Sequence, residues 1–217
     1  MKSINILCFL LLSTTLSLVP FVAFSRSFTS DNPIVLPTTT HNLIDPAVLD
    51  VDGVPLKIGE DYIINNPLIG GGAVYWKNIG NHKCPNVVSQ HTSSIDNIGD
   101  GMPVKFVLKA NDDVIREMVA INIKFSNDTS KPCGNETVWK VDDKEFVVTG
   151  GTLGNENTFF KIMKYETEGT VRSKYEYKLL YCPPQLMCKD VTVASHENYP
   201  RLVAGNNGFQ QFVFMKT

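Results

Sequence analysis

Apolar and polar residues alternate in short segments along most of the chain. In residues 119–125 every odd position is apolar, and two of the three residues between them are polar. This is the period of a half-buried β-strand. Similar segments, rich in β-branched and aromatic residues, recur between turns that contain Gly, Asn, Asp or Pro. They are residues 47–53, 61–65, 73–79, 85–90, 103–109, 118–125, 137–143, 144–150, 159–166, 174–182, 190–195, 201–205 and 210–216.

These segments predict an all-β protein of about twelve short strands. Only residues 112–118 have some helical character, and they are too few to form an independent helix. A sandwich, a barrel and a threefold β-trefoil all fit this strand count. Weak internal echoes favour the trefoil, because residues 74–85 and 177–183 both end a strand in Cys-Pro, and the VYWK segment resembles the TVWKV segment at 137–141.

The N-terminus has the profile of a signal peptide. Lys2 precedes an apolar run from Ile4 to Phe24, and the small residues Ala23 and Ser25 favour cleavage after Ser25. A retained membrane anchor is the alternative, although Pro20 interrupts the run. No later stretch is apolar enough to span a bilayer. We therefore expect residues 1–25 to direct the chain into the secretory pathway, with no membrane partner afterwards.

The next segment reads as a flexible leader, because residues 26–41 are rich in Ser, Thr, Pro and Asn and have no apolar period. It contains a short apolar motif between two prolines, which nothing in a polar leader would bury. The motif consists of Asn32, Pro33, Ile34, Val35, Leu36 and Pro37. It is either an extended arm that packs on the domain or a sorting signal read by a receptor.

The remaining residues, 43–217, are enough for one domain. The chain has 20 basic and 22 acidic residues, and this balance gives no electrostatic reason to expect nucleic acid as a partner. Its histidines lack metal-ligand spacing, no nucleophile motif is present, and we expect neither a metal nor a cofactor. The neighbouring carboxylates of Asp142 and Asp143 are expected to point into water. The sequence therefore predicts a protein that is not an enzyme, and we expect a monomer.

Four cysteines remain once the signal peptide, with Cys8, is removed: Cys84, Cys133, Cys182 and Cys188. An even number in an oxidising compartment predicts two disulfides, for which three pairings are possible. The short spacing from Cys182 to Cys188, around two prolines, favours a small local loop. A zinc site is the rival interpretation, but no Cys-x-x-Cys pair exists. Sequons at Asn127 and Asn135 flank Cys133, and we expect at least one to carry a glycan.

The sequence resembles the Kunitz soybean-type inhibitor family of plants. An N-terminal signature of that family is matched by Val48, Asp50, Asp52, Gly53, Leu56 and Tyr62, with Val54 as a departure from its usual polar residue. The cysteines and the closing segments 200–203 and 210–216 are also similar. The resemblance implies a β-trefoil with pseudo-threefold symmetry, and it implies bridges from Cys84 to Cys133 and from Cys182 to Cys188.

Within that family the chain is most similar to the tuber cysteine protease inhibitors of nightshade-family plants. The similar segments include NPIVLP, YIINNPL, GAVYWKNIGN and FKIMK. The resemblance implies that residues 26–42 are a propeptide whose NPIVLP motif directs the protein to the vacuole, with an extracellular location as the alternative. It also implies target proteases as partners and a role in plant defence.

Inhibitors of this kind offer a rigid loop to the protease cleft, and its prior order saves the entropy that a flexible peptide would lose. The candidate inhibitory loop contains Ile98, Gly99, Asp100, Gly101, Met102, Pro103 and Val104, and a secondary loop contains Gly70, Gly71 and Gly72. Either segment is otherwise a plain connection between strands. The three glycines do not form a phosphate loop, because no Gly-Lys-Ser/Thr follows them.

Met102 or Pro103 stands where a trypsin inhibitor of this family has Arg or Lys. The loop therefore favours papain-like cysteine proteases, with serine or aspartic proteases as the alternative. A storage or carbohydrate-binding trefoil is the rival from another class. For a sugar platform only Trp76 and Trp139 are available, and both lie in strand-like segments where core packing is expected.

Overall fold

The computed structural model describes residues 45–68, 71–78, 87–92, 101–108, 112–126, 137–165, 174–205, 208 and 210–217. These residues belong to one compact unit, Leu43–Thr217. They contain twelve β-strands and one 3₁₀ turn, Glu156–Thr158, and no α-helix. The predicted all-β class is confirmed. Among the described residues, none forms a helix with the length and apolar character needed to cross a bilayer.

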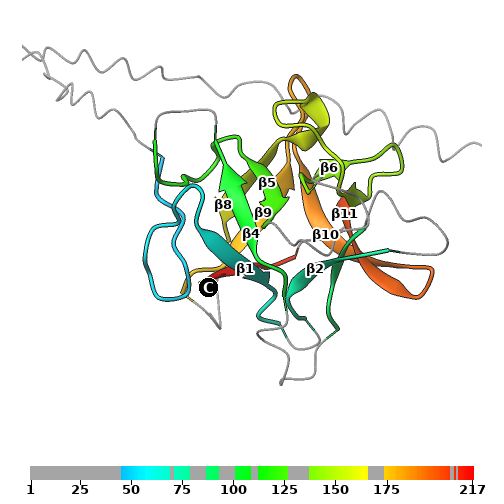
Figure 1. Cartoon of the computed structure of the whole chain (residues 1–217), viewed down its shortest axis with the longest axis horizontal. Coiled ribbons are helices and arrows are strands. Elements are labelled where there is room, and N and C mark those ends of the chain that lie inside the picture. The colour runs from blue at the N-terminus through cyan, green and yellow to red at the C-terminus, as the bar shows by residue number, and fades with distance from the viewer. Residues whose placement is uncertain are drawn as a thin grey trace, which may run out of the picture. The chain divides into compact units, whose positions relative to one another are not determined.

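The strands follow the predicted segments closely (Figure 1). They are β1 (Asp61–Asn65), β2 (Val74–Lys77), β3 (Val87–Gln90), β4 (Val104–Val107), β5 (Asn122–Phe125), β6 (Lys140–Val141), β7 (Val147–Val148), β8 (Phe160–Lys164), β9 (Tyr177–Tyr181), β10 (Lys189–His196), β11 (Tyr199–Gly205) and β12 (Val213–Lys216). The segment 47–53 is the exception. It forms only isolated bridges, Ala47 with Arg116 and Leu49 with Pro55, because a turn at residues 51–53 interrupts it.

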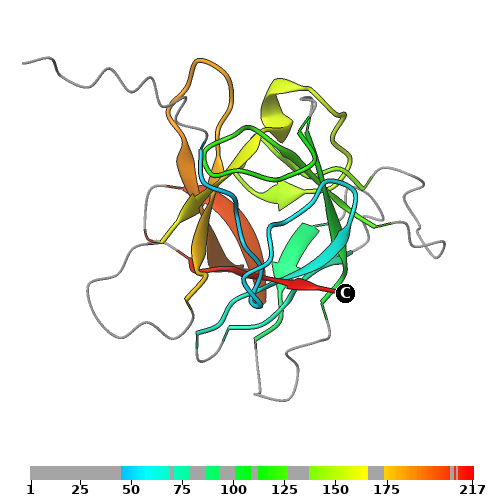
Figure 2. The same cartoon turned by 90° about the vertical axis from the view of Figure 1, so that its left-hand side faces the viewer.

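Six strands form a closed ring. One sheet has the order β12-β1-β4-β5, and β8 pairs with β9 in the other. Two single bridges join these sheets, Ile121 with Phe160 before β5 and Tyr177 with Phe212 before β12. The ring is therefore β1, β4, β5, β8, β9 and β12, and Figure 2 shows these strands arranged around a common centre. Ring closure leaves none of these strands with a wholly unpaired edge.

The other six strands form three hairpins, β2 with β3, β6 with β7, and β10 with β11. The hairpins also pair with one another. Val87 of β3 lies opposite Val148 of β7, and Ser89 of β3 lies opposite Arg201 of β11. Along the chain each hairpin lies between two ring strands: β2 and β3 between β1 and β4, β6 and β7 between β5 and β8, and β10 and β11 between β9 and β12. The three hairpins meet beside the ring.

The interior is filled by large apolar side chains from all parts of the described chain. The largest fully buried ones are Trp139, Tyr62, Tyr177, Phe106, Phe125, Phe160, Phe212 and Phe214. Several pack edge to face, such as Trp139 and Phe160, whose ring centres are 6.2 Å apart at 86°. This geometry suits the aromatic quadrupole. The core fixes the ring strands, and these hold the connections described below.

Candidate functional site

The C-terminal end of the candidate inhibitory loop is anchored to the core. Met102 packs against buried residues, and its peptide N–H donates to the carbonyl of Val74 at 2.9 Å. Val104 is fully buried as the first residue of β4. The Pro103 carbonyl accepts the peptide N–H of Ser126 at 2.8 Å. Gly101 to Val104 therefore form the base of the loop. Ile98, Gly99 and Asp100 lie outside the residues that the structure describes.

Side chains would not fit at Gly71 and Gly72, the two glycines of the secondary loop that the structure describes. The peptide N–H of Gly71 donates to the Leu68 carbonyl at 2.8 Å. A Cβ atom on Gly71 would lie 2.4 Å from the side chain of Asn66, and one on Gly72 would lie 2.6 Å from the carbonyl oxygen of His91. Glycine is required at both positions because neighbouring atoms lie too close for any side chain. Gly70 lies outside the described residues.

The structure brings the two candidate loops together. A Cβ atom on Gly101 would lie 2.6 Å from the Cβ of Ala73 and 2.7 Å from Cγ2 of Ile63. Ala73 also accepts the peptide N–H of His91 at 3.0 Å, and the His91 ring stacks on Tyr75 with centres 4.0 Å apart. The bases of both loops thus share one packed support at the start of β2. A rigid support of this kind is what a preorganised binding loop requires.

A polar cluster lies beside the start of β4. Asp61, Lys105, Lys124 and Ser126 line a shallow hollow there. Asp61 pairs with Lys105 at 3.1 Å and accepts a hydrogen bond from the Ser126 hydroxyl. Burial raises the pKa of Asp61, but the bonds from Ser126 and Lys105 outweigh it and hold that pKa below its ordinary value. Lys105 also donates to the Gly59 carbonyl at 2.9 Å, so it is held along β4.

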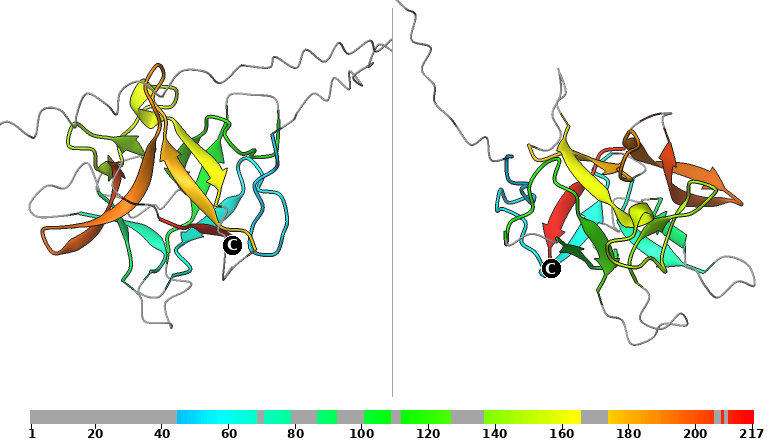
Figure 3. Two further views of the ribbon diagram at one scale, coloured as in Figure 1. Left: turned by 180° about the vertical axis from the view of Figure 1, so that it is seen from behind. Right: turned by 90° about the horizontal axis from the view of Figure 1, so that it is seen from above.

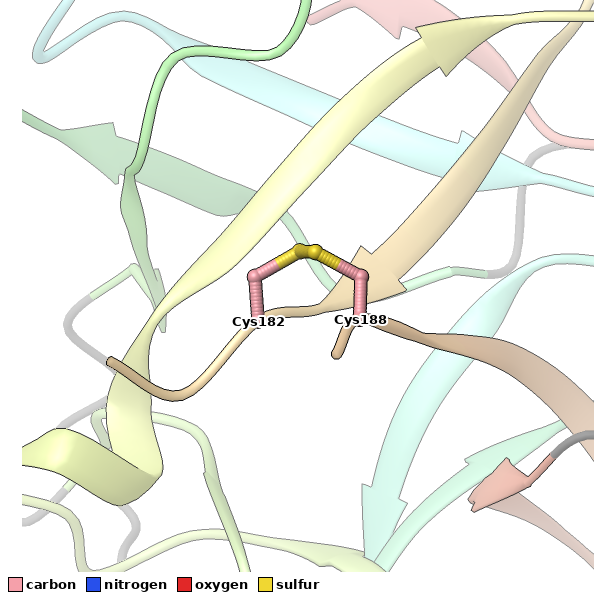
Figure 4. The surroundings of a disulfide bond; sticks show 2 residues. All are labelled: Cys182 and Cys188. Atoms are coloured by element: carbon pink, nitrogen blue, oxygen red, sulfur yellow. A yellow bond between two sulfur atoms is a disulfide. The ribbon is translucent and has the colours of Figure 1, made fainter. Parts of the chain in front are cut away.

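The disulfide between Cys182 and Cys188 closes the connection from β9 to β10 (Figure 4). The Cα atoms of the two cysteines are 4.2 Å apart. The neighbouring residues Tyr181 and Lys189 pair in the strand ladder, so the bridge extends that pairing by one position. Leu186 and Met187 inside this loop are both exposed, although the sequence pattern does not predict a site there. The Cys-x5-Cys spacing was the signal, because so short a closed loop cannot bury its own side chains.

Several predicted residues lie outside the described part of the chain. They are Cys84 and Cys133, the sequons at Asn127 and Asn135, and the sorting motif from Asn32 to Pro37. Among the described residues no cluster of His, Cys, Asp and Glu could hold a metal ion. Asp142 differs from its expected place in water. Its carboxylate accepts the peptide N–H groups of Lys144 and Phe146, both at 2.9 Å.

The N-terminal signature has a structural explanation. Val48 and Leu56 are fully buried, and Asp50, only 3% exposed, accepts two peptide N–H groups of the turn between them. Gly53 has φ of +80°, which other residues rarely adopt. The Tyr62 hydroxyl accepts the peptide N–H of Lys57 at 2.8 Å. Of the signature residues, Val48, Asp50, Gly53, Leu56 and Tyr62 therefore order the entry into β1, and the side chain of Asp52 is exposed.

The chain is similar to known proteins over almost all of its length. The model of the Kunitz legume family, described as trypsin and protease inhibitor, matches residues 48–216, and the chain belongs to this family. The similar potato proteins are named as protease inhibitors and not as enzymes. Cysteine protease inhibitor 1 of Solanum tuberosum is 57% identical over 224 residues, covering 100% of both chains.

Solved structures agree with this assignment. The Kunitz-type cysteine protease inhibitor PCPI-3 from potato is 39% identical, with a TM-score of 0.68 over 80% of this chain and 98% of that chain. Soybean trypsin inhibitor in complex with porcine pancreatic trypsin is 26% identical, with a TM-score of 0.64 over 79% of this chain and 99% of that one. The fold is thus shared with inhibitors named for two protease classes.

Proposed function

We propose that this protein inhibits papain-like cysteine proteases by reversible, stoichiometric occlusion of the active-site cleft. The observation that carries the proposal is the 57% identity, over the whole of both chains, to a protein named as a cysteine protease inhibitor. The structure supplies what such a mechanism needs, which is loops held on a rigid support without a chemical group of their own. Blocking digestive proteases would contribute to plant defence against feeders.

Trypsin-like inhibition is less well supported by the base of the candidate loop. Met102 is half-buried and packs against the core, whereas a specificity residue presents its whole side chain to the protease. Lys105 is the nearest basic residue, but it pairs with Asp61 and the Gly59 carbonyl within the strand region. A trypsin-like pocket needs a free Arg or Lys at the cleavage position. Serine and aspartic proteases therefore remain the alternative targets to be tested.

A storage or carbohydrate-binding role is also less well supported. Trp139 is fully buried, and Trp76 packs against the core from β2, where it lies opposite Val88. A sugar platform needs an aromatic face open to water, whereas Trp139 has none and the core covers part of Trp76.

We further propose that the domain is a β-trefoil with pseudo-threefold symmetry. Support comes from the repeated order of ring strand, hairpin and ring strand, which occurs as β1 to β4, β5 to β8 and β9 to β12. The second disulfide, from Cys84 to Cys133, belongs to this proposal, because it is the pairing that remains once Cys182 bonds to Cys188. Non-reducing peptide mapping would test it, and a peptide containing either cysteine as a free thiol would contradict it.

We also propose a cellular location for the protein. Residues 1–25 would be removed as a signal peptide and residues 26–42 as a propeptide that directs the domain to the vacuole. Support comes from the full-length match, which includes this leader. Expression of the chain in plant cells, with N-terminal sequencing and mass measurement of the product, would give the cleavage points and any glycan at Asn127 or Asn135. Secretion to the medium would overturn the vacuolar address.

Titration of that purified product against papain, trypsin, chymotrypsin and cathepsin D tests the function. We expect stoichiometric inhibition of papain, with weaker effects on the other three enzymes. Inhibition of trypsin alone would move the target to serine proteases. If the purified product at micromolar concentration inhibited none of the four enzymes, the proposed function would be overturned.

A further inference from the structure

Two large apolar side chains protrude from the loop that joins β9 to β10. Leu186 is 70% exposed and Met187 is 89% exposed, whereas the next most exposed large hydrophobic side chain in the described residues, Val54, is 49% exposed. A single exposed apolar residue is ordinary on a protein surface. Two neighbouring ones at the tip of a closed loop form a compact apolar surface. Removing this surface from water on binding would be favourable.

A disulfide and two backbone hydrogen bonds hold the loop that carries them in one conformation. The disulfide joins its two ends, and the peptide N–H of Cys182 donates to the carbonyl of Phe159 at 2.9 Å. Within the loop the Leu186 N–H donates to the Pro183 carbonyl at 3.3 Å, which forms a turn with Pro184 second and Gln185 third. The φ of Gln185 is +65°, as the third residue of a type II turn requires. Little further entropy would be lost on binding.

The loop is a projection and not a groove. Figures 2 and 3 show the connection between β9 and β10 extending beyond the strands that carry it. Figure 1 places it at the top of the domain, while Gly71 to Val74, which support the other two loops, lie at the bottom. The Pro183–Met187 surface is therefore separate from the candidate inhibitory loop, and one protease cleft cannot contact both at once.

The shape and chemistry of this surface select the kind of partner. A projecting apolar tip fits a concave apolar pocket, and a protease cleft that accepts apolar side chains is such a pocket. Beside the tip lies a hollow lined by Ala120, Phe159 and Lys161. The lysine favours a partner with acidic groups at the rim of its pocket. A second copy of this chain is a poorer match, because a projection does not complement itself.

We propose that the β9–β10 loop, Pro183–Met187, is a second protease-binding surface whose Leu186 and Met187 side chains enter the apolar substrate pocket of a cysteine protease. The proposal rests on the proposed function and makes the inhibitor double-headed, with one site at each end of the domain. Leu186 and Met187 would be its central contacts, and Lys161 would lie at the rim of the interface.

The test compares variants of the full chain, produced in plant cells, against papain. Leu186→Asp with Met187→Asp places two charges in the proposed pocket, and Leu186→Ala with Met187→Ala only removes the contacts. The matched control is Val51→Asp with Val54→Asp, which adds the same charges at exposed apolar positions of another turn. Circular dichroism and a urea melt show that each variant is folded. Mass spectrometry under saturating papain, with its catalytic cysteine alkylated, gives the stoichiometry.

We expect the wild type to bind two papain molecules and the folded loop variants to bind one, with papain affinity at the second site reduced by at least about 30-fold. The control should bind two. One papain bound by wild type and variants alike, with inhibition unchanged, would overturn the second surface and leave the proposed function intact. No binding or inhibition by the wild type would overturn both. A wild-type dimer that the loop variants convert to monomer, with unchanged inhibition, would overturn the proposal in favour of self-association.

Discussion

Asp50 and Asp142 organise two turns in the same way, although they lie on different parts of the chain. In each turn one carboxylate oxygen accepts the peptide N–H groups of the second and fourth residues that follow, at 2.8 to 3.0 Å. The third residue is left-handed in both, Gly53 with φ of +80° and Glu145 with φ of +68°. A buried or half-buried aspartate here replaces the backbone partners that a tight turn lacks.

Replacement of Asp50 should therefore destabilise the domain. Asp50→Ala leaves two peptide N–H groups without their acceptor, and we expect a loss of about 2–3 kcal/mol in the free energy of unfolding. Asp50→Asn keeps the accepting oxygen and should cost less than about 1 kcal/mol. Urea unfolding measures both values. The exposed neighbour Asp52 provides the control, and an Asp50→Ala variant as stable as Asp52→Ala would refute the capping role.

Gly101 should be intolerant of even a methyl group. A Cβ atom there would lie within 2.7 Å of both Ala73 and Ile63, whereas nothing lies within 4 Å of one on Gly205. We expect Gly101→Ala to destabilise by about 1–3 kcal/mol through overpacking. Gly205→Ala should be neutral or slightly stabilising, because it lowers the entropy of the unfolded chain. Chemical denaturation of both variants checks the difference. Equal denaturation midpoints would mean that the residues around Gly101 can shift to accept a methyl group at little cost.

Asp61 should make stability depend on acid pH. Its pKa is lowered in the folded state, because the Ser126 and Lys105 bonds outweigh the effect of burial. The stabilisation is present above the ordinary value of 3.8 and is lost as the pH falls below it through the lower folded pKa. We expect Asp61→Asn to weaken the fall in the urea midpoint between about pH 5 and pH 2.5. The Asp143→Asn variant controls for net charge. An Asp61→Asn variant with the wild-type pH profile would exclude this linkage.

The bridge between Cys182 and Cys188 should contribute to global stability as well as to the loop. Closing so short a loop is worth about 2 kcal/mol in the chain-entropy account. We expect Cys182→Ser with Cys188→Ser to reduce the free energy of unfolding by about that amount. Reductant alone does not isolate the effect, because Cys84 and Cys133 would be exposed to it too. A double variant with wild-type stability would show that strand pairing already closes the loop.

The strand pattern could be predicted well because burial alternates with position. Ile121, Ile123 and Phe125 are buried as their period indicates. Asn122, between them, is buried too, at 8% exposure, because its amide donates to the carbonyl and the hydroxyl of Thr158 at 2.8 and 2.9 Å. That partner is 36 residues away. Local periodicity holds no information about it.

The candidate site was predicted less fully, for a similar reason. The sequence identified both glycine-containing segments, but only the fold shows that Gly101 packs on Ala73 and that Met102 packs, half-buried, against the core. A methionine before a proline looks like a loop residue when its neighbours in space are unknown. The sequence pattern also does not predict that Leu186 and Met187 are exposed, because their exposure follows from the short loop that the disulfide closes around them.

The disulfide between Cys182 and Cys188 encloses residues 183–187, and it changes the outcome of proteolytic cleavage within them. Hydrolysis of a peptide bond normally frees two ends, and their departure makes the reaction one-way. Here both new ends would stay fastened to β9 and β10, whose ladder holds them in place. The products could not diffuse apart, so the cut would remain open to resealing. Scission at this tip would therefore leave the two parts of the inhibitor joined.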